Sequence, residues 1–253
     1  MKVSTSLTLE IKNKEHILTF GIADQKQEQE SVHRLRYQIY LKKEYIDQKD
    51  FPDESEKDSF DEDGSCIYFI ACVNKKIFGT IRLIKTNPLP TEKFFKFDEP
   101  DQIKELKKSG SIAELSRFVI KPTHEEIGEF LPRNLTMLFI LDSLMKYSEE
   151  NNIQGGYFFL KNSLETKMEK LKFPLHPINN YALLYPKNAK LSKYFYQPTD
   201  TVAPFYFLTQ EYKKYLSKVT DNKLIFEKEN SGREFRLKSN PYTHFLRMLG
   251  VIK

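Results

Sequence analysis

Two apolar segments that follow one another, CIYFIACV and KIFGTIRLI, constrain the fold of this chain more than any other feature. They predict strands over residues 65–73 and 76–85, and only Asn74 and Lys75 lie between them. Two strands joined by so short a turn pair antiparallel. Because both segments are almost wholly apolar, we place this hairpin at the centre of a sheet. A purely parallel sheet is therefore excluded.

Strands and helices alternate along the rest of the chain. Apolar periodicity and turn residues predict strands at 16–23, 111–120, 156–161, 181–185 and in PFYFL, and helices at 30–45, 134–151 and from Ser163. Asn134 is expected to cap the second helix. Residues 87–110, with three prolines, are expected to form a loop. The sequence predicts a mixed α/β domain with helices on both faces of a central sheet.

The end of the chain is less regular than its middle. Residues 224–237 are expected to form a hairpin ahead of a short closing helix. We assign residues 1–215 to the domain and residues 216–253 to a C-terminal extension packed on or beside it.

Composition limits the classes of protein to consider. The chain has 253 residues and 40% hydrophobic content, enough for a packed core, and its formal net charge of +5 favours acidic partners without indicating nucleic acid. Cys66 and Cys72 lie in one apolar strand, which indicates buried thiols and not a disulfide framework or metal ligands. No signal peptide and no membrane span is recognisable, so we expect a cytoplasmic protein.

Six ionisable residues in or beside apolar segments carry the functional prediction. They are Arg36, Asp58, Asp61, Arg82, Glu114 and Arg117. An uncompensated buried charge costs several kcal/mol or more. We therefore expect these side chains to meet in one polar site inside the core. For the acidic turn taken alone, solvated carboxylates or a strand cap remain an alternative.

The segment IAELSRFVI contains two of these residues in a strand. Strict alternation places Glu114, Ser116 and Phe118 on one face and Arg117 on the other. Glu114 and Arg117 can share a pocket only if the strand has a bulge, and bulges are frequent next to active sites. A half-buried strand with its charges at the sheet rim is the alternative.

Other catalytic signatures are missing from the sequence. The five histidines are scattered and none has metal-ligand spacing. Neither a G-x-S-x-G, nor a P-loop, nor a G-x-G-x-x-G motif occurs. We expect no metal site.

The order and separation of four motifs resemble the acyl-homoserine-lactone synthases, also called autoinducer synthases, of the GNAT acyltransferase superfamily. The motifs are Arg36 with Tyr40, the acidic loop Glu56–Asp61, Gly79–Leu83 (G-x-x-R-L) and Glu114–Phe118 (E-x-S-R-F). The resemblance covers about residues 30–175 and extends to the N-acyl amino acid synthases and the exosortase-associated acyltransferases. It implies a GNAT-like fold, with a mostly antiparallel sheet, in a bacterial protein.

Two departures from the resembled pattern bear on the substrates. Tyr45 and Ile46 stand where autoinducer synthases usually carry Trp, which bears on the homoserine-lactone acceptor. The superfamily's glycine-rich coenzyme A loop is missing between Ile120 and Asn134. In the resembled family this absence goes with donors on acyl carrier protein.

The resemblance implies transfer of a fatty acyl chain from a phosphopantetheine thioester, on acyl carrier protein or coenzyme A, to the amine of an amino-acid-type acceptor. Glu114 would take the amine proton, with Arg117 and Ser116 as further catalytic candidates. The substrate-binding candidates are Arg36, Tyr40, Asp58, Asp61, Arg82 and Phe118. The acyl chain would lie near Leu138, Phe139 and Phe158, although core packing explains these residues equally well. No permanently bound cofactor is implied.

Two other functions remain open at this point. One is a catalytically silent GNAT-like module that binds acyl carrier protein or an acyl ligand. The other is an ordinary acetyl-coenzyme A acetyltransferase, which the missing glycine-rich loop argues against.

Overall fold

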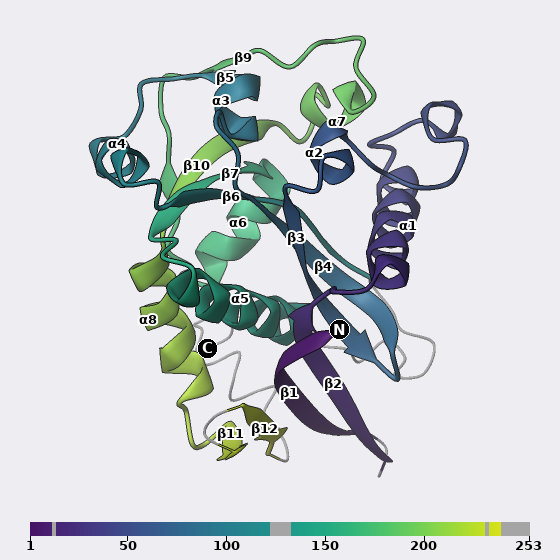
Figure 1. Ribbon diagram of the computed structural model, residues 1–253, viewed down its shortest axis with the longest axis vertical. Coiled ribbons are helices and arrows are strands. Elements are labelled where there is room, and N and C mark those ends of the chain that lie inside the picture. Colours follow the sequence, from purple (N-terminus) through teal and green to yellow (C-terminus); the bar gives the residue numbers. More distant parts are fainter. Residues whose placement is uncertain (12–13, 122–132, 231–232, 239–253) are drawn as a thin grey trace.

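One large sheet forms the centre of the molecule (Figure 1). The computed structural model describes residues 1–11, 14–121, 133–230 and 233–238. Within these residues the sheet has ten strands in the order β11-β12-β1-β2-β3-β4-β6-β7-β10-β8. The pairs β1–β12 and β6–β7 are parallel, and the other pairs are antiparallel. The expected mixed, mostly antiparallel sheet is confirmed.

The strands differ widely in length. Those of the sheet are β1 (Lys2–Ile11), β2 (Lys14–Ile22), β3 (Cys66–Val73), β4 (Lys76–Ile84), β6 (Ile112–Ile120), β7 (Gly155–Lys161), β8 (His176–Pro177), β10 (Val202–Leu208), β11 (Phe226–Glu229) and β12 (Glu234–Leu237). A separate two-stranded sheet pairs β5 (Phe95–Lys96) with β9 (Ala182–Leu183).

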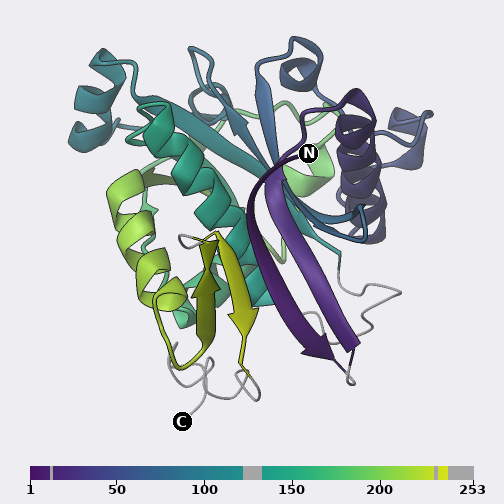
Figure 2. The same cartoon turned by 60° about the horizontal axis from the view of Figure 1, so that its bottom comes forward.

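Helices cover both faces of the sheet, as expected. One face carries α5 (Arg133–Glu150), α6 (Asn162–Lys170) and α8 (Thr209–Thr220), whose apolar side chains join the main core. Figure 2 shows α5 and α8 side by side. The opposite face carries α1 (Lys26–Lys42), the turn η1 (Gln48–Asp50), α2 (Ser59–Glu62), α3 (Pro90–Phe94), α4 (Asp101–Lys108) and α7 (Ser192–Phe195).

The β3–β4 hairpin forms where the sequence predicts it. Asn74 and Lys75 both have positive φ, 48° and 64°, as a two-residue hairpin turn requires. The buried strands on each side then bring Arg82 to the middle of the sheet, paired with Tyr68 on one side and Ser116 on the other.

Strand β6 contains the bulge that a shared pocket for Glu114 and Arg117 requires. The register against β4 shifts between Thr80 and Arg82, and Arg117 takes a φ of 55°. A left-handed backbone at a non-glycine residue costs of order 1–3 kcal/mol and is most frequent at functional sites. The bulge turns Arg117 to the α1 face of the sheet, next to Ser116.

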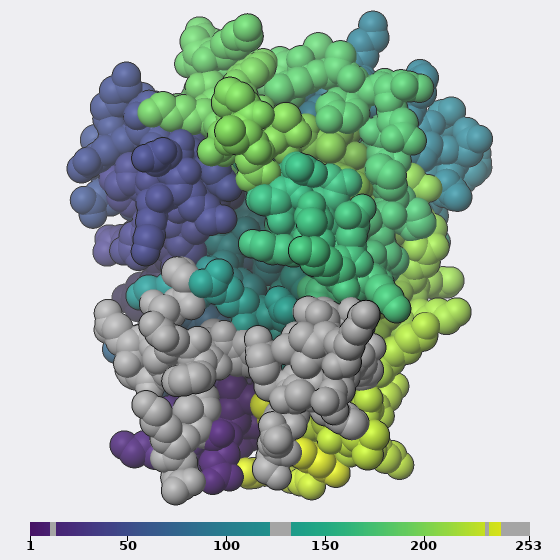
Figure 3. All heavy atoms as spheres, turned by 180° about the vertical axis from the view of Figure 1, so that it is seen from behind, coloured from purple at the N-terminus to yellow at the C-terminus, as the bar shows by residue number. Residues whose placement is uncertain are grey.

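Strands β6 and β7 pair only over their first residues. The parallel register joins Ile112 with Gly155 and ends at Glu114 with Tyr157, although both strands continue. The two strands therefore diverge toward their carboxyl ends. Seen from behind, the surface is hollowed between the blue segment with α1 and the green segment with α6, and teal residues lie deeper between them (Figure 3).

Gly156 allows the backbones of β6 and β7 to approach each other closely where they pair. A Cβ at this position would lie 1.6 Å from the carbonyl oxygen of Ala113 on β6. We expect Gly156→Ala to lower the free energy of unfolding by at least about 3 kcal/mol, because a backbone strand cannot move aside as a side chain can. Urea denaturation measures the loss.

Gly64 offers a matched control for that substitution. It has a φ of 75°, and a Cβ there would meet nothing within 4 Å. Gly64→Ala should cost only about 1–2 kcal/mol, the usual penalty of a left-handed residue with a side chain. Equal losses in the two variants would contradict the steric explanation.

Some sequence predictions of local structure were wrong. Residues 87–110 are not a loop, because α3, β5 and α4 lie within them. Asn134 is not the cap of α5 (Arg133–Glu150), because Arg133 before it already lies in the helix. The first strand, β1, was not predicted. The predicted closing helix lies outside the described residues.

The division of the chain into residues 1–215 and 216–253 stays a prediction. Helix α8 runs across the proposed boundary, and β12 pairs with β1 in the main sheet.

Candidate active site

Six charged side chains lie together on the α1 face of the sheet. We call them the ionic cluster: Arg36, Glu56, Asp58, Asp61, Arg82 and Arg117. They come from α1, from the acidic loop that leads into α2, and from the two central strands β4 and β6. The cluster contains three guanidinium groups and three carboxylates, so its formal charges cancel.

Arg36 is buried completely and binds two carboxylates. Its Nε donates to Glu56 Oε2 at 2.5 Å, and its two Nη atoms donate to the two oxygens of Asp61 at 3.0 and 2.7 Å. Such paired bonds fix both the distance and the plane of the two groups. Arg36 thus ties the acidic loop to α1.

Arg82 and Arg117 hold the same loop from the sheet. Arg82 donates to both oxygens of Asp58, at 2.7 and 2.9 Å, and through Nε to the hydroxyl of Ser116 at 3.0 Å. Arg117 donates to Asp58 Oδ2 at 2.8 Å and to Glu56 Oε1 at 3.1 Å. Arg82 also forms an ion pair with Asp61 Oδ1 at 2.8 Å, so each carboxylate of the cluster bridges two arginines.

The local sequence folds the acidic loop to suit this pairing. Asp58 is the N-cap of α2 and accepts from the backbone N–H groups of Phe60 and Asp61, while Asp61 accepts from the N–H of Asp58. This reciprocal capping places both carboxylates at one end of a single helical turn. Phe60 is buried and anchors the turn.

The charges of the cluster stabilise one another. Burial by itself would raise the pKa of Asp61, but Arg36 and Arg82 hold it well below its usual range. Burial by itself would also raise the pKa of Asp58, but Arg117 and Arg82 lower it. Both aspartates are therefore ionised at any pH near neutral.

Glu114 lies in the same face but outside this network. Its carboxyl is fully buried, Oε2 accepts from the backbone N–H of Thr91 at 2.6 Å, and Oε1 has no hydrogen-bond partner in the structure. Burial raises the pKa of Glu114 to about 8, and the Thr91 N–H opposes that shift. Glu114 is thus a largely protonated acid at pH 7, located where β6 and β7 diverge.

The remaining predicted site residues divide between the two faces of the sheet. Ser116 accepts from Arg82 and so lies against the ionic cluster. Tyr40 is buried on the same face, and burial raises its pKa to about 12. Phe118 lies beyond the bulge and packs against the main core on the other face. Leu138, Phe139 and Phe158 belong to that core as well, so their contact with an acyl chain stays a prediction.

Three residues of the site were not singled out from the sequence. Glu56 is buried and binds both Arg36 and Arg117. Tyr68 donates to Asp61 Oδ1 at 2.8 Å, and its oxygen lies 3.2 Å from Nε2 of His33. Burial and the neighbouring Arg36 lower the pKa of His33 to about 4, so this imidazole is neutral. The motif E-x-D-x-F-D contained the signal for Glu56.

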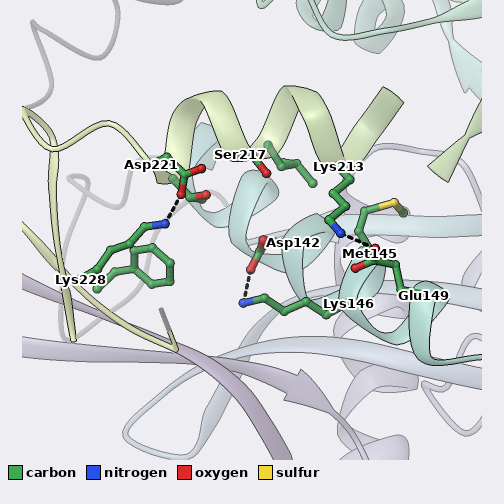
Figure 4. Close-up of a pocket in the computed structure, with 11 residues that line it drawn as sticks. Asp142, Met145, Lys146, Glu149, Lys213, Ser217, Asp221 and Lys228 are labelled. Atoms are coloured by element: carbon green, nitrogen blue, oxygen red, sulfur yellow. Dashed lines mark hydrogen bonds and ion pairs between the residues drawn. The ribbon is translucent and has the colours of Figure 1, made fainter. Parts of the chain in front are cut away.

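Two pockets of the described structure lie away from these residues. One, of about 230 Å³, lies between α5, α8 and the β11–β12 strands, and its charged residues pair with one another (Figure 4). The other, of about 610 Å³, lies between the end of α1 and α7. Neither is lined by any predicted site residue. Glu114 and the ionic cluster are packed inside the protein, except that the Asp58 side chain is partly exposed.

Comparison with protein families confirms the resemblance that the motifs indicated. Residues 31–147 match the model of the family described as FeeM, N-acyl amino acid synthase. This range contains the whole ionic cluster and Glu114. The match indicates an acyltransferase. Comparison with curated protein sequences found no match.

Solved structures with the same fold include two such synthases. The acyl-homoserine lactone synthase LasI is 19% identical, with a TM-score of 0.54 over 80% of this chain and 95% of its own. FeeM, an N-acyl amino acid synthase from uncultured soil microbes, is 15% identical, with a TM-score of 0.53 over 79% of this chain and 95% of its own. At these identities the likeness shows a shared fold.

A third similar structure is MesI, described as a CoA-dependent acyl-homoserine lactone synthase. It is 19% identical, with a TM-score of 0.52 over 77% of this chain and 88% of its own. In the described part of this chain, no helix is long and apolar enough to cross a membrane.

Proposed function

We propose that this protein is an N-acyltransferase that moves a fatty acyl chain from a phosphopantetheine thioester to the amine of an amino-acid-type acceptor. The donor is carried by acyl carrier protein or coenzyme A. No permanently bound cofactor takes part, and the proposal includes a cytoplasmic location.

The observation that carries this proposal is the environment of Glu114. An ammonium ion has no lone pair, so an amine must lose a proton before or while it attacks a carbonyl. Glu114 has one unpartnered oxygen and a pKa near 8, and a general base is most efficient when its pKa lies near the working pH. Its placement in a buried site suits transfer to an amine and not to water.

The diverging strands offer a place for the thioester arm. Beyond Glu114 and Tyr157, β6 and β7 no longer pair with each other, so the backbone edges that face one another can bind an extended arm with amide groups. The bulge at Arg117 lies in the part of β6 that no longer pairs with β7, and it interrupts the register of β6 against β4. A backbone N–H freed by the bulge would stabilise the oxyanion that forms when the amine attacks.

In this proposal the ionic cluster shapes the acceptor pocket and does not bind the acceptor through a free charge. Each of its carboxylates already bridges two arginines, so the formal charges of the cluster cancel. Arg36, Asp58, Asp61 and Arg82 hold the acidic loop against the sheet, and Arg117 and Ser116 line the floor next to Glu114. Tyr40 forms the wall on the α1 side, and Phe118 backs the strand from the other face.

A carrier protein fits the charge of this chain. Carrier proteins of this kind are acidic, and this protein has a formal net charge of +5. Such complementarity speeds association and loses its effect as the salt concentration rises.

The proposal is tested with purified protein. Acyl donors of several chain lengths, on carrier protein and on coenzyme A, are mixed with single amino acids and with S-adenosylmethionine, and products are identified by mass spectrometry. We expect one N-acylated product class. If every donor binds but none reacts with any acceptor, the protein is instead a silent module that binds acyl carrier protein or an acyl ligand.

A further inference from the structure

A buried lysine at the end of β7 does not belong to the ionic cluster. Lys161 is 4% exposed, and its ammonium donates to Gln197 Oε1 at 3.1 Å and to the carbonyl oxygen of Asp200 at 2.7 Å. Both acceptors are uncharged. Burial lowers the pKa of Lys161 to about 8. A buried cation whose hydrogen-bond acceptors are all neutral favours the approach of an anion.

A second lysine lies against the same aromatic ring. The Nζ of Lys161 is 5.2 Å from the centre of the Tyr45 ring, and that of Lys43 is 5.5 Å from it. Lys161 also lies 4.8 Å from the centre of the Tyr194 ring. The rings orient the two ammonium groups by cation–π contacts but add no negative charge. Repulsion from Lys43 also lowers the pKa of Lys161, so the two like charges lie within reach of each other.

A third lysine adds to the positive charge of this place. Partial burial lowers the pKa of Lys43, and repulsion from Lys167 on α6 lowers it further. The carboxylate of Asp200 acts on both Lys43 and Lys161, and it already accepts from the N–H and the hydroxyl of Ser163. Positive charge therefore exceeds negative charge here.

The position of these lysines in the fold suggests the ligand. Lys161 is the last residue of β7, at the end where β6 and β7 diverge, and Lys43 follows the last residue of α1. Lys161 is the fourth residue after Tyr157 on the strand, a distance of about 13 Å at the usual rise of a strand. An arm that lies between the strands with its thioester near Glu114 would leave them at this point.

We propose that Lys43 and Lys161, with Lys167 at the rim, bind the phosphate of the donor's phosphopantetheine arm. This inference rests on the proposed function. It assigns to lysine side chains the phosphate contact for which the sequence offers no glycine-rich loop. The same phosphate is present in acyl carrier protein and in coenzyme A.

The test removes the phosphate from the ligand and the charge from the protein. Calorimetry compares 4′-phosphopantetheine with pantetheine for the wild type, Lys43→Gln and Lys161→Gln. We expect the wild type to bind the phosphorylated arm about tenfold or more tightly, and each variant to lose most of that preference. Lys104→Gln, an exposed lysine on α4, should keep it.

Two results of the binding experiment would overturn the phosphate site. One is equal binding of both arms by the wild type. The other is an equal loss of affinity for 4′-phosphopantetheine and pantetheine in Lys43→Gln, since that would show an effect on the binding site that does not depend on the phosphate. Because binding is measured without turnover, a phosphate preference in a protein that makes no product would contradict the proposed function and leave this site standing.

Kinetics with the two natural donors separates the sources of the phosphate. Both acyl carrier protein and coenzyme A should show a higher KM in the Lys43→Gln variant. The donor with the lower KM in the wild type is the one that the site serves. A KM unchanged by the substitution for both donors would contradict the site.

Discussion

Glu114→Gln is expected to lower kcat by about 10²–10⁴-fold, the usual contribution of a general base, with little change in folding. Gln has the shape of the protonated acid and can still accept from the Thr91 N–H. Because the pKa of Glu114 is raised to about 8, the wild-type rate should rise with pH until about pH 8 and then level. Steady-state kinetics from pH 6 to 9.5 measures both effects.

A second expected effect of Glu114→Gln, on stability, and a control variant make this test specific. The folded protein binds the Glu114 proton more tightly than the unfolded chain does, so protonation of Glu114 adds to the free energy of unfolding. This added stability is complete below the unfolded pKa of about 4.3 and is lost as the pH rises through about 8. Glu114→Gln should therefore resist alkaline unfolding better than the wild type. Glu105→Gln, on the exposed side of α4, serves as the control. A Glu114→Gln variant with wild-type kcat would contradict the role of Glu114 as base.

Arg36→Ala is expected to lower the free energy of unfolding by about 3–5 kcal/mol, the cost of breaking a buried ion pair from one side. The substitution leaves Glu56 and Asp61 without the group that binds both of them. Arg36→Lys should recover only part of the loss, since an ammonium cannot form the paired bonds of a guanidinium. Urea denaturation at pH 7 compares the three proteins.

A matched control lies two residues away on the same helix. Arg34 is exposed on α1, and Arg34→Ala should change stability by no more than about 0.5 kcal/mol. If Arg36→Ala and Arg34→Ala had equal effects, the cluster would not hold the acidic loop to α1 as described.

The meeting of the charged residues was predictable because each one lies beside apolar sequence. A buried charge without a partner is costly, so the sequence predicts that Arg36, Asp61 and Arg82 pair with one another. Strand alternation also showed that Glu114 and Arg117 needed a bulge between them, and the bulge is present. These conclusions follow from local sequence and from the cost of a buried charge.

The partners of the charges were less accessible to sequence reasoning. Glu56 and Arg117 are 61 residues apart, and Tyr68 reaches Asp61 from the next strand, so only the assembled sheet shows these contacts. The prediction of a loop at residues 87–110 was wrong because it treated each proline as the end of regular structure, whereas a proline can also begin a helix. Pro90 is the first residue of α3 and Pro100 is the N-cap of α4, positions where the missing N–H costs nothing.

The central claim is that this fold performs N-acyl transfer with Glu114 as base. Mass spectrometry of lipid extracts from cells that express the wild type or Glu114→Gln, with both proteins shown to be folded, tests it most directly. We predict an N-acylated amino acid or N-acyl homoserine lactone in the wild-type extract that is absent from the Glu114→Gln extract. The same product at the same level in both extracts would contradict the claim.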